Sequence, residues 1–422
     1  MLCDRFMCLL LLTGAVAASA AVVCATDDDC SLLGVCIDGA CRCDPGWSGA
    51  DCGVAALLPY DDLEHLGYVN ASRASWGGRP LRINGTWHMF ATEIAARCPL
   101  ILFMNNSMIV RAESTTSSAA GPYARADDDV GGIVRPAFAH NPSAVGPTPD
   151  GYYLVYSIGG AAAGNARPNP TDWLLDCQAK LPACAAVNQC RGHGTPASNG
   201  QVVLSYARDP VSGPWSHRVV LPVGGSDTTP PNNHSAWNCK HNNPSAVLHS
   251  ATGAVTLMYH GSTCDKSLKG ERLGIADAAH WNDTTYVKRA GPPIIAPENG
   301  TGSHEDPFLW QDRRGHWHAL THNQGPGNRC ESSDAGHSCG AHLFSRDSRS
   351  WRISKQAAYT PAVMLKSNGS TVTLGTRQRP QLVFSDDGLQ RPLFLFNGAS
   401  FEGNNPDLNM LTHTLAFEFM SG

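Results

Sequence analysis

Short apolar runs separated by Gly, Pro, Asn and Asp recur along most of the chain. Residues 152–156 (YYLVY), 255–259 (VTLMY) and 393–396 (LFLF) are rich in aromatic and branched side chains, and each run follows a turn that contains Gly or Asp. Such runs are typical of short β-strands. Residues 413–419 place apolar side chains at every second position, which predicts a further strand. The hydrophobic pattern therefore predicts an all-β fold.

A polar residue followed by proline introduces four of these strand-like segments. We call these polar residues leaders; they are Asn141, Asn243, Asp306 and Arg379. The last three follow one another at intervals of about 60 to 75 residues, the length of four short strands with their turns. A further unit without such a leader includes residues 87–91 and 108–112.

Five units of this length predict a five-bladed β-propeller over residues 54–422, because radial repetition protects the edges of small sheets. The C-terminal strand is expected to close the ring by pairing into the first or the last blade. A two-sheet sandwich is the alternative architecture, and it would show no repeat of this length.

The interval between Asn141 and Asn243 is longer than the others and predicts a loop insertion at residues 160–200. Three cysteines in the insertion cannot pair among themselves, so at least one must reach another loop. The cysteines of this group and their candidate partners are Cys177, Cys184, Cys190, Cys98, Cys239 and Cys264. Cys330 and Cys339 are expected to form a local pair.

The N-terminal residues 1–20 read as a secretory signal peptide. Arg5 precedes the apolar residues 7–12, and the small residues 18–20 supply a cleavage pattern. A retained membrane anchor is the alternative, but the apolar stretch is shorter than the roughly 20 residues that a span needs. We expect a secreted protein with no transmembrane segment after signal cleavage.

Six cysteines lie close together in residues 21–53, a segment with too little apolar material to form a core. Its tail, residues 41–52 (CRCDPGWSGADC), resembles the EGF-like module. The resemblance implies disulfides joining Cys24 to Cys36, Cys30 to Cys41 and Cys43 to Cys52. The acidic cluster that the calcium-binding subtype carries before its first cysteine is missing, so no calcium is expected. A spacer is the simplest role for the module, and contact with a protein partner is the alternative.

The net charge and the Asn-X-Ser/Thr triplets bear on the partners and the modification of the protein. Lys and Arg number 31 against 36 Asp and Glu, a formal net charge of -5, so the chain has no basic field for phosphates and nucleic acid is not an expected partner. Asn-X-Ser/Thr triplets predict a glycoprotein. They begin at Asn70, Asn84, Asn105, Asn233, Asn282, Asn299 and Asn368.

The units together resemble the five-bladed propeller of glycoside hydrolase family 43 and its relatives. The Asn-Pro, Asp-Pro and Arg-Pro leaders carry the resemblance, together with the phrases SYARDPVSGPW and EDPFLWQDRRGHWHALTH, over about residues 70 to 400. It implies that the start of each innermost strand faces a central funnel where sugar binds and carboxylates hydrolyse it.

Glycoside hydrolysis requires two carboxyl groups about 5 to 10 Å apart. Asp306 and its neighbour Glu305 are the best placed, but alternation along a strand predicts that the two do not face one channel. Glu93, which follows the first unit's strand, is the next candidate. We therefore expect Glu93 and Asp306 to be the catalytic pair.

Polar residues near the leaders are candidates for substrate binding: His140, Asn141, His241, Asn243, His322, Arg377 and Arg379. Asparagine binds sugar hydroxyls but takes no proton, so Asn141 and Asn243 lower the expectation of catalysis. Turn formation explains each leader singly, and the two arginines either clamp an acidic sugar or pair with Asp306 or Glu305. No metal or cofactor is expected.

Two functions follow from these residues. The first is hydrolysis of an extracellular polysaccharide by carboxylate acid/base catalysis. The second is non-catalytic carbohydrate binding or adhesion through the same funnel.

Overall fold

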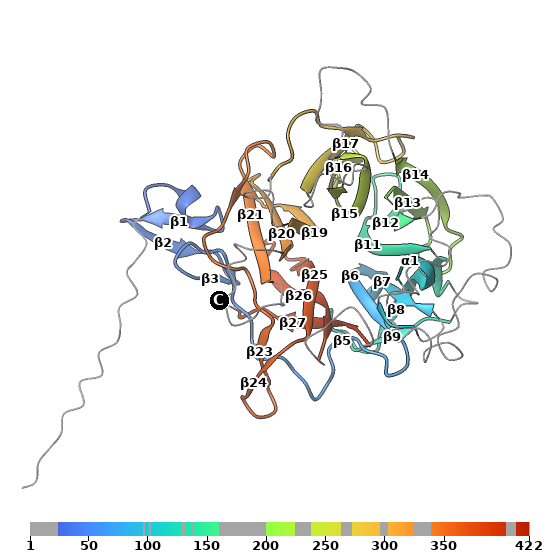
Figure 1. Cartoon of the computed structure of the whole chain (residues 1–422), viewed down its shortest axis with the longest axis horizontal. Helices are drawn as coiled ribbons and strands as arrows, with labels where there is room; N and C mark the ends of the chain where they lie inside the picture. Colours follow the sequence, from blue (N-terminus) through green and yellow to red (C-terminus); the bar gives the residue numbers. More distant parts are fainter. Residues whose placement is uncertain are drawn as a thin grey trace, which may run out of the picture.

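A computed structural model describes residues 24–95, 98–100, 103–127, 131–136, 138–159, 200–223, 238–262, 272–295, 303–324, 339–401 and 411–421. Within these ranges the chain is a five-bladed β-propeller preceded by a small disulfide-rich module (Figure 1). The predicted fold is confirmed, and the sandwich alternative is wrong. The proposed signal peptide, most of the insertion at 160–200, Asn233, Asn299 and Cys330 lie outside the described residues.

The N-terminal module has the disulfide pairing that its resemblance implied. Bonds join Cys24 to Cys36, Cys30 to Cys41 and Cys43 to Cys52. A 3-10 turn, η1 (Asp27–Cys30), precedes the hairpin β1 (Gly34–Ile37) and β2 (Ala40–Cys43). Strand β3 (Trp47–Ser48) then pairs with β4 (Val54–Ala55). The cross-links replace a hydrophobic core in this short segment.

The five blades are antiparallel sheets, and in the second, third and fourth blades the strands follow one another in chain order from the axis outward. The first contains β6 (Ser75–Ile83), β7 (Thr86–Ile94), β8 (Ser107–Ser114), β9 (Tyr123–Arg125) and β10 (Ile133–Arg135), with the short α1 (Phe103–Asn106) between β7 and β8. The second contains β11 (Ala139–Val145), β12 (Tyr153–Gly159), β13 (Val202–Ala207) and β14 (Ser216–Leu221). The third contains β15 (Lys240–His249), β16 (Ala254–Ser262), β17 (Arg272–Ala278) and β18 (Val287–Lys288). The fourth contains β19 (Ser303–Gln311), β20 (Trp317–Gln324), β21 (Cys339–Ser345) and β22 (Arg352–Ile353).

The fifth blade closes the ring with strands from both ends of the propeller segment. β25 (Thr376–Phe384), β26 (Pro392–Ser400) and β27 (His413–Glu418) are joined at the outer edge by β5 (Gly67–Tyr68). The C-terminal strand therefore pairs in the last blade, one of the two predicted alternatives. A separate hairpin, β23 (Ala362–Met364) with β24 (Thr371–Thr373), lies between the fourth and fifth blades in the sequence.

Each innermost strand contains a bulge at the same point. Gly77 and the four leaders have φ angles between 47° and 59°, in the left-handed region, and the register of each innermost strand shifts there. An extra residue of this kind bends a strand and turns a side chain away from the regular alternation. Proline follows each of the four leaders, and because it lacks an N–H the bulge leaves no unpaired donor at that position.

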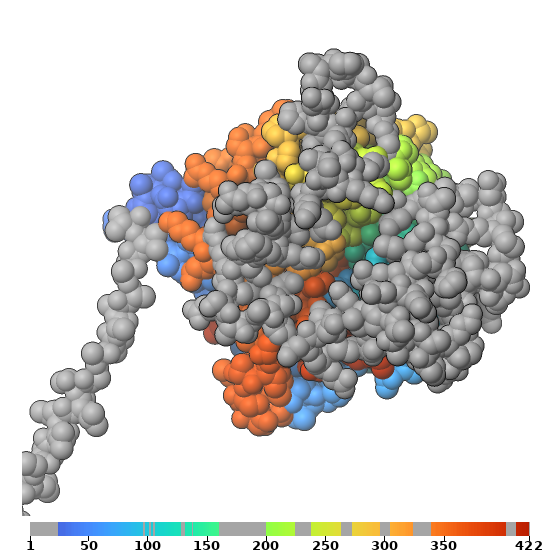
Figure 2. Space-filling view, viewed as in Figure 1, coloured from blue at the N-terminus to red at the C-terminus, as the bar shows by residue number. Residues whose placement is uncertain are grey.

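The EGF-like module packs against the fourth blade, where Figure 2 shows its blue atoms beside orange ones. The ring of Trp47 stacks on Trp310 with centroids 6.2 Å apart and tilts against Phe419 at 5.8 Å. Arg314 donates to the carbonyl of Leu32 and to the carboxylate of Asp44. Trp310 is buried in this contact.

Three cysteines of the propeller, Cys98, Cys239 and Cys339, are disulfide-bonded. In the described part of the chain no helix is long and apolar enough to cross a membrane.

Candidate functional site

Three leaders from three blades meet on the propeller axis. The side-chain nitrogen of Asn141 donates to Asn243 Oδ1 at 2.7 Å and to Asp306 Oδ1 at 3.2 Å. All three residues are buried, between 3% and 4% exposed. Segments more than a hundred residues apart in the chain are thus joined by side chains that the bulges turn inward.

Arg379 of the fifth blade completes this group. Its Nη2 donates to the carbonyls of Asn141 and Pro244 at 2.9 and 3.0 Å, and its Nη1 lies 3.6 Å from Asp306 Oδ1. The side chain is fully buried. Arg379 therefore pairs with Asp306 inside the axis, one of the two roles considered for it.

Glu305 and Asp306 both approach His322, although they are neighbours in the chain. His322 Nδ1 lies 3.8 Å from Glu305 Oε2 and 3.6 Å from Asp306 Oδ2. The expectation that strand alternation keeps the two carboxylates apart is wrong. The reason is the bulge: Asp306 has a φ of 54° and leaves the extended conformation that produces alternation.

The two carboxylates differ in exposure. The Asp306 side chain is 4% exposed and that of Glu305 is 22% exposed. Glu305 also accepts from Asn243 Nδ2 at 3.1 Å and lies 3.7 Å from His260 Nδ1. Glu305 is therefore the carboxylate of this pair that a ligand can reach.

Asp306 carries its charge in the folded protein. Burial acts to raise the pKa of Asp306, but the close approach of His322 and the positive charge of Arg379 outweigh it and lower the pKa below its usual range. Burial lowers the pKa of Arg379, and Asp306 opposes that shift. A buried ion pair that is also hydrogen-bonded fixes the geometry of the axis.

Glu93 lies elsewhere in the first blade and is fully buried. Its carboxylate accepts from the Tyr68 hydroxyl at 2.6 Å and from Arg73 at 2.8 Å, and lies 3.2 Å from Arg125 Nε. No contact among the described residues joins Glu93 to Asp306. The structure thus brings Asp306 together with Glu305 and surrounds Glu93 with cations.

The remaining predicted binding residues lie around the axial group. The His140 ring is tilted against Phe103 with centroids 4.7 Å apart, and His241 meets Tyr259 edge-on at 5.1 Å. Burial lowers the pKa of each histidine to about 3. Both rings are therefore neutral at pH 7.

Arg377 does not join the axial group. Its guanidinium lies 3.9 Å from the ring centroid of Phe417 and donates to Asn397 Oδ1 at 3.1 Å and to the carbonyl of Thr360 at 2.8 Å. These contacts join the first strand of the fifth blade to its second and third strands and to the segment that precedes the blade. Arg377 thus holds the blade together, and its contacts among the described residues include none of the leaders.

Glu305, Asp306 and His322 also have the composition of a cation site. One ligand atom from each lies within 4.8 Å of the others, and two carboxylates with an imidazole suit a divalent ion. A second such group, Cys24, Cys30 and Cys41, consists of disulfide sulfurs and has no thiolate to offer.

Sequence reasoning missed two members of the site. Gly77 takes the leader position of the first blade, but it has neither a polar side chain nor a following proline to mark it. His260 reaches Glu305 from the second strand of the third blade. The one sequence feature that could have identified His260 is its position at the end of the predicted strand, directly after residues 255–259.

Comparisons with known proteins agree with both parts of the fold. Residues 26–55 match the family described as the Teneurin-like EGF domain. The N-terminal module is an EGF-like domain. No curated protein matches the chain at a significant level.

Solved structures resemble the propeller at low sequence identity. A complex of BT0996 with RGII is 11% identical with a TM-score of 0.52, and the match covers 86% of this protein and 92% of BT0996. A structure named only as a glycoside hydrolase is 13% identical with a TM-score of 0.50, covering 85% and 92%. A thermostable family-43 glycoside hydrolase is 9% identical with a TM-score of 0.48, covering 85% and 91%. The first two matches share the propeller fold with this chain.

Proposed function

We propose that the protein is an extracellular carbohydrate-binding protein whose sugar site is the leader mouth, the end of the propeller axis formed by Gly77 and the four leaders. The observation that carries the proposal is Glu305. Its carboxylate is partly exposed and is held by Asn243 while His260 and His322 lie beside it. Sugar hydroxyls donate well to a fixed carboxylate, since charged hydrogen bonds are stronger than neutral ones.

The surroundings of Glu305 support a polar ligand. Hydrogen bonds and an ion pair hold Asn141, Asn243 and Arg379 against one another and against Asp306, so these polar groups are positioned before a ligand binds. Preorganised polar groups converging at one mouth are what a small-ligand site requires. The disulfide-rich EGF-like domain supports an extracellular setting.

Binding is favoured over hydrolysis because one reachable carboxylate is not enough for acid/base catalysis. Glu93 is enclosed by Tyr68, Arg73 and Arg125, and Asp306 is sealed by Arg379 and Asn141. Asn141 and Asn243 occupy two leader positions without an ionisable group.

Hydrolysis remains a second candidate because of one distance. Carboxylate oxygens of Glu305 and Asp306 lie within 4.8 Å of each other. Retaining glycosidases place their two carboxyl groups about 5 to 5.5 Å apart. In this case ionised Asp306 is the nucleophile, Glu305 is the acid, and sugar must displace the Asn141 contact to reach Asp306.

A glycan array with purified protein tests the proposal. Wild-type protein should bind at least one class of glycan, and Glu305→Gln should weaken that binding at least tenfold because the charged acceptor is lost. Glu64→Gln, which changes an exposed carboxylate before the first blade, should bind like wild type. Absence of glycan binding by wild-type protein, or full binding by Glu305→Gln, would contradict the proposal.

The same samples separate binding from hydrolysis. Reducing ends released from polysaccharide mixtures are measured for wild type and for Asp306→Asn. Binding without release supports the first function. Release that Asp306→Asn abolishes supports hydrolysis, and release that Asp306→Asn retains rules out this carboxylate pair.

A further inference from the structure

The propeller axis has an opening at the end away from the leaders. The leaders lie near the start of the innermost strands, and the last residues of the same strands surround a cavity of about 700 Å³. All five innermost strands line it. Four of them contribute Arg79 and Leu81 of β6, Val145 of β11, Val247 of β15 and Phe384 of β25, and the fifth is β19. We call this cavity the rear pocket.

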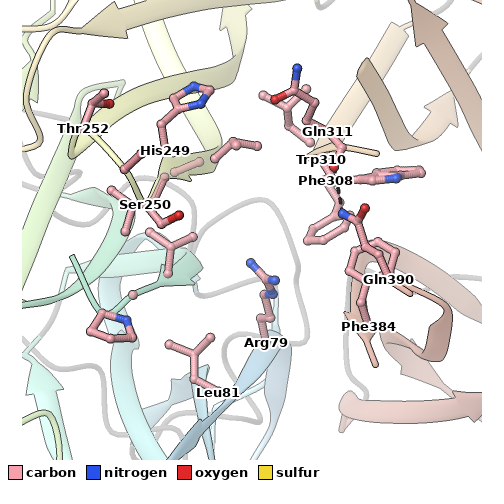
Figure 3. A pocket seen from close by; sticks show the side chains of 18 residues that line it. Arg79, Leu81, His249, Ser250, Thr252, Phe308, Trp310, Gln311, Phe384 and Gln390 are labelled. Atoms are coloured by element: carbon pink, nitrogen blue, oxygen red, sulfur yellow. Dashed lines mark hydrogen bonds between the residues drawn. The ribbon is translucent and has the colours of Figure 1, made fainter. Parts of the chain in front are cut away.

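The wall formed by β19 and its neighbours is aromatic. Phe308 and Trp310 belong to this strand and lie beside Phe384 and Gln390 in Figure 3. The opposite wall is formed by His249 and the turn after it, which includes Ser250 and Thr252. The pocket therefore combines aromatic and aliphatic side chains with neutral polar groups.

Arg79 is the one charged side chain among the residues that line the rear pocket. The lining includes no Asp, Glu or Lys, and burial lowers the pKa of its other titratable residue, His249, so that ring is neutral at pH 7. Figure 3 shows the Arg79 guanidinium projecting into the open space between the two walls.

The described contacts of Arg79 leave most of its donors unused. Its Nη1 reaches the carbonyl of Ala144 at 3.4 Å, a long contact, and its Nε has no hydrogen-bond partner. The guanidinium also lies 5.3 Å from the ring centroid of Phe308. Burial lowers the pKa of Arg79 to about 10, which leaves it positively charged at pH 7. A partly buried cation without a carboxylate is unusual, because such charges are normally paired.

We infer that the rear pocket is a second ligand site, which binds a carboxylate carried on an apolar body. The planar fork of Arg79 matches a carboxylate in two-point contact, and the aromatic and aliphatic walls cover the rest of the ligand. This site is separate from the leader mouth and does not depend on the sugar proposal. Small organic acids and the free C-terminus of a peptide share this chemistry.

Titration calorimetry or ligand-observed NMR with hexanoate tests the inference on the full-length protein. Hexanoate should bind, and its neutral counterpart hexanamide should bind at least tenfold more weakly. A short peptide ending in leucine, with a free or an amidated C-terminus, forms the second arm. Binding of hexanoate alone identifies a small-acid site, and preference for the free peptide terminus identifies a peptide site. Failure of both carboxylates to bind would overturn the inference.

Variants assign the binding to Arg79. Arg79→Met should lower the affinity at least tenfold, while Arg79→Lys should retain part of it because the charge stays. Arg82→Met on the same strand removes an exposed arginine paired with Asp386 and should bind like wild type. Glu305→Gln should also bind hexanoate normally, which separates this site from the leader mouth. Unchanged binding by Arg79→Met, with the fold verified by circular dichroism, would overturn the inference.

Discussion

The side chain of Arg379 occupies the space that a Cβ atom at Gly77 would need. A methyl group built on Gly77 overlaps Arg379 Cγ, and Gly77 has a φ of 59°. The first blade therefore has a glycine at its leader position so that the arginine of the fifth blade can cross the axis. There it reaches carbonyls of the second and third blades. This pairing links the two blades on either side of the ring closure.

Gly77→Ala should lower the free energy of unfolding by about 2 to 5 kcal/mol, the sum of left-handed strain and overpacking. Urea denaturation measures it. Gly85→Ala is the matched control, because Gly85 also has a positive φ, 89°, but a Cβ there meets nothing within 4 Å. The control should lose only about 1 to 2 kcal/mol. Equal losses in the two variants would show that the contact with Arg379 has no energetic weight.

Arg379→Met should destabilise the propeller by about 3 to 5 kcal/mol, since it leaves Asp306 as an unpaired buried charge. Adding Asp306→Asn in the same chain should recover part of this loss, because the second change removes that charge. A double-mutant cycle from thermal or urea unfolding measures the coupling. Additive effects of the two substitutions would contradict a direct pairing.

The sign of the pH response gives a separate test of this pair. The pKa of Asp306 is lowered in the folded protein, so its contribution to stability is present above the unfolded pKa of about 3.9 and is lost as the pH falls below that value. Wild-type protein should lose this contribution on acidification, and Asp306→Asn should not. Urea unfolding at several pH values measures the difference, and identical acid profiles for the two proteins would contradict it.

The cysteine spacing and the proline-marked leaders were enough to predict both parts of the fold. Their physical meaning is local: closely spaced cysteines replace a core, and a polar residue before proline marks four of the five bulges. The sequence did not identify Gly77 because glycine is needed there to make room for Arg379, which lies about 300 residues later in the chain. Such a long-range contact leaves no local pattern.

The site was predicted only in part for a similar reason. Asn141, Asn243, Asp306 and Arg379 were expected to converge, and the structure places them within hydrogen-bonding reach on the axis. The pairing of Glu305 with Asp306 was excluded by strand alternation. Alternation fails at a left-handed bulge, and the sign of φ cannot be read from an Asp-Pro pair alone.

Glu93→Gln should reduce stability by about 2 to 3 kcal/mol, because Arg73 and Arg125 lose their common anion while Arg73 remains half exposed to water. Glycan binding at the leader mouth should not change. Glu113→Gln, whose side chain is 50% exposed beside Arg111, should cost less than about 1 kcal/mol. If the Glu93→Gln protein kept its stability but lost glycan binding or turnover, Glu93 would have a direct role in binding or catalysis.

Stability at mildly acidic pH should depend on His342, which joins the fourth blade to the EGF-like domain. Its Nδ1 contacts Ser354 Oγ at 2.7 Å, and Ser354 donates to Ser31 of that domain at 2.8 Å. Burial, with a smaller effect of His318, lowers the pKa of His342 well below 6.5. The unfolded chain therefore binds more protons below about pH 6.5, and stability falls as the pH decreases from 7 to 5, by about 2 kcal/mol for one such group. Urea titrations at several pH values measure this slope, and His342→Gln should flatten it. His65→Gln, at an exposed position, should leave the slope unchanged. Equal slopes in all three proteins would show that protonation of His342 does not weaken the packing of the EGF-like domain on the fourth blade.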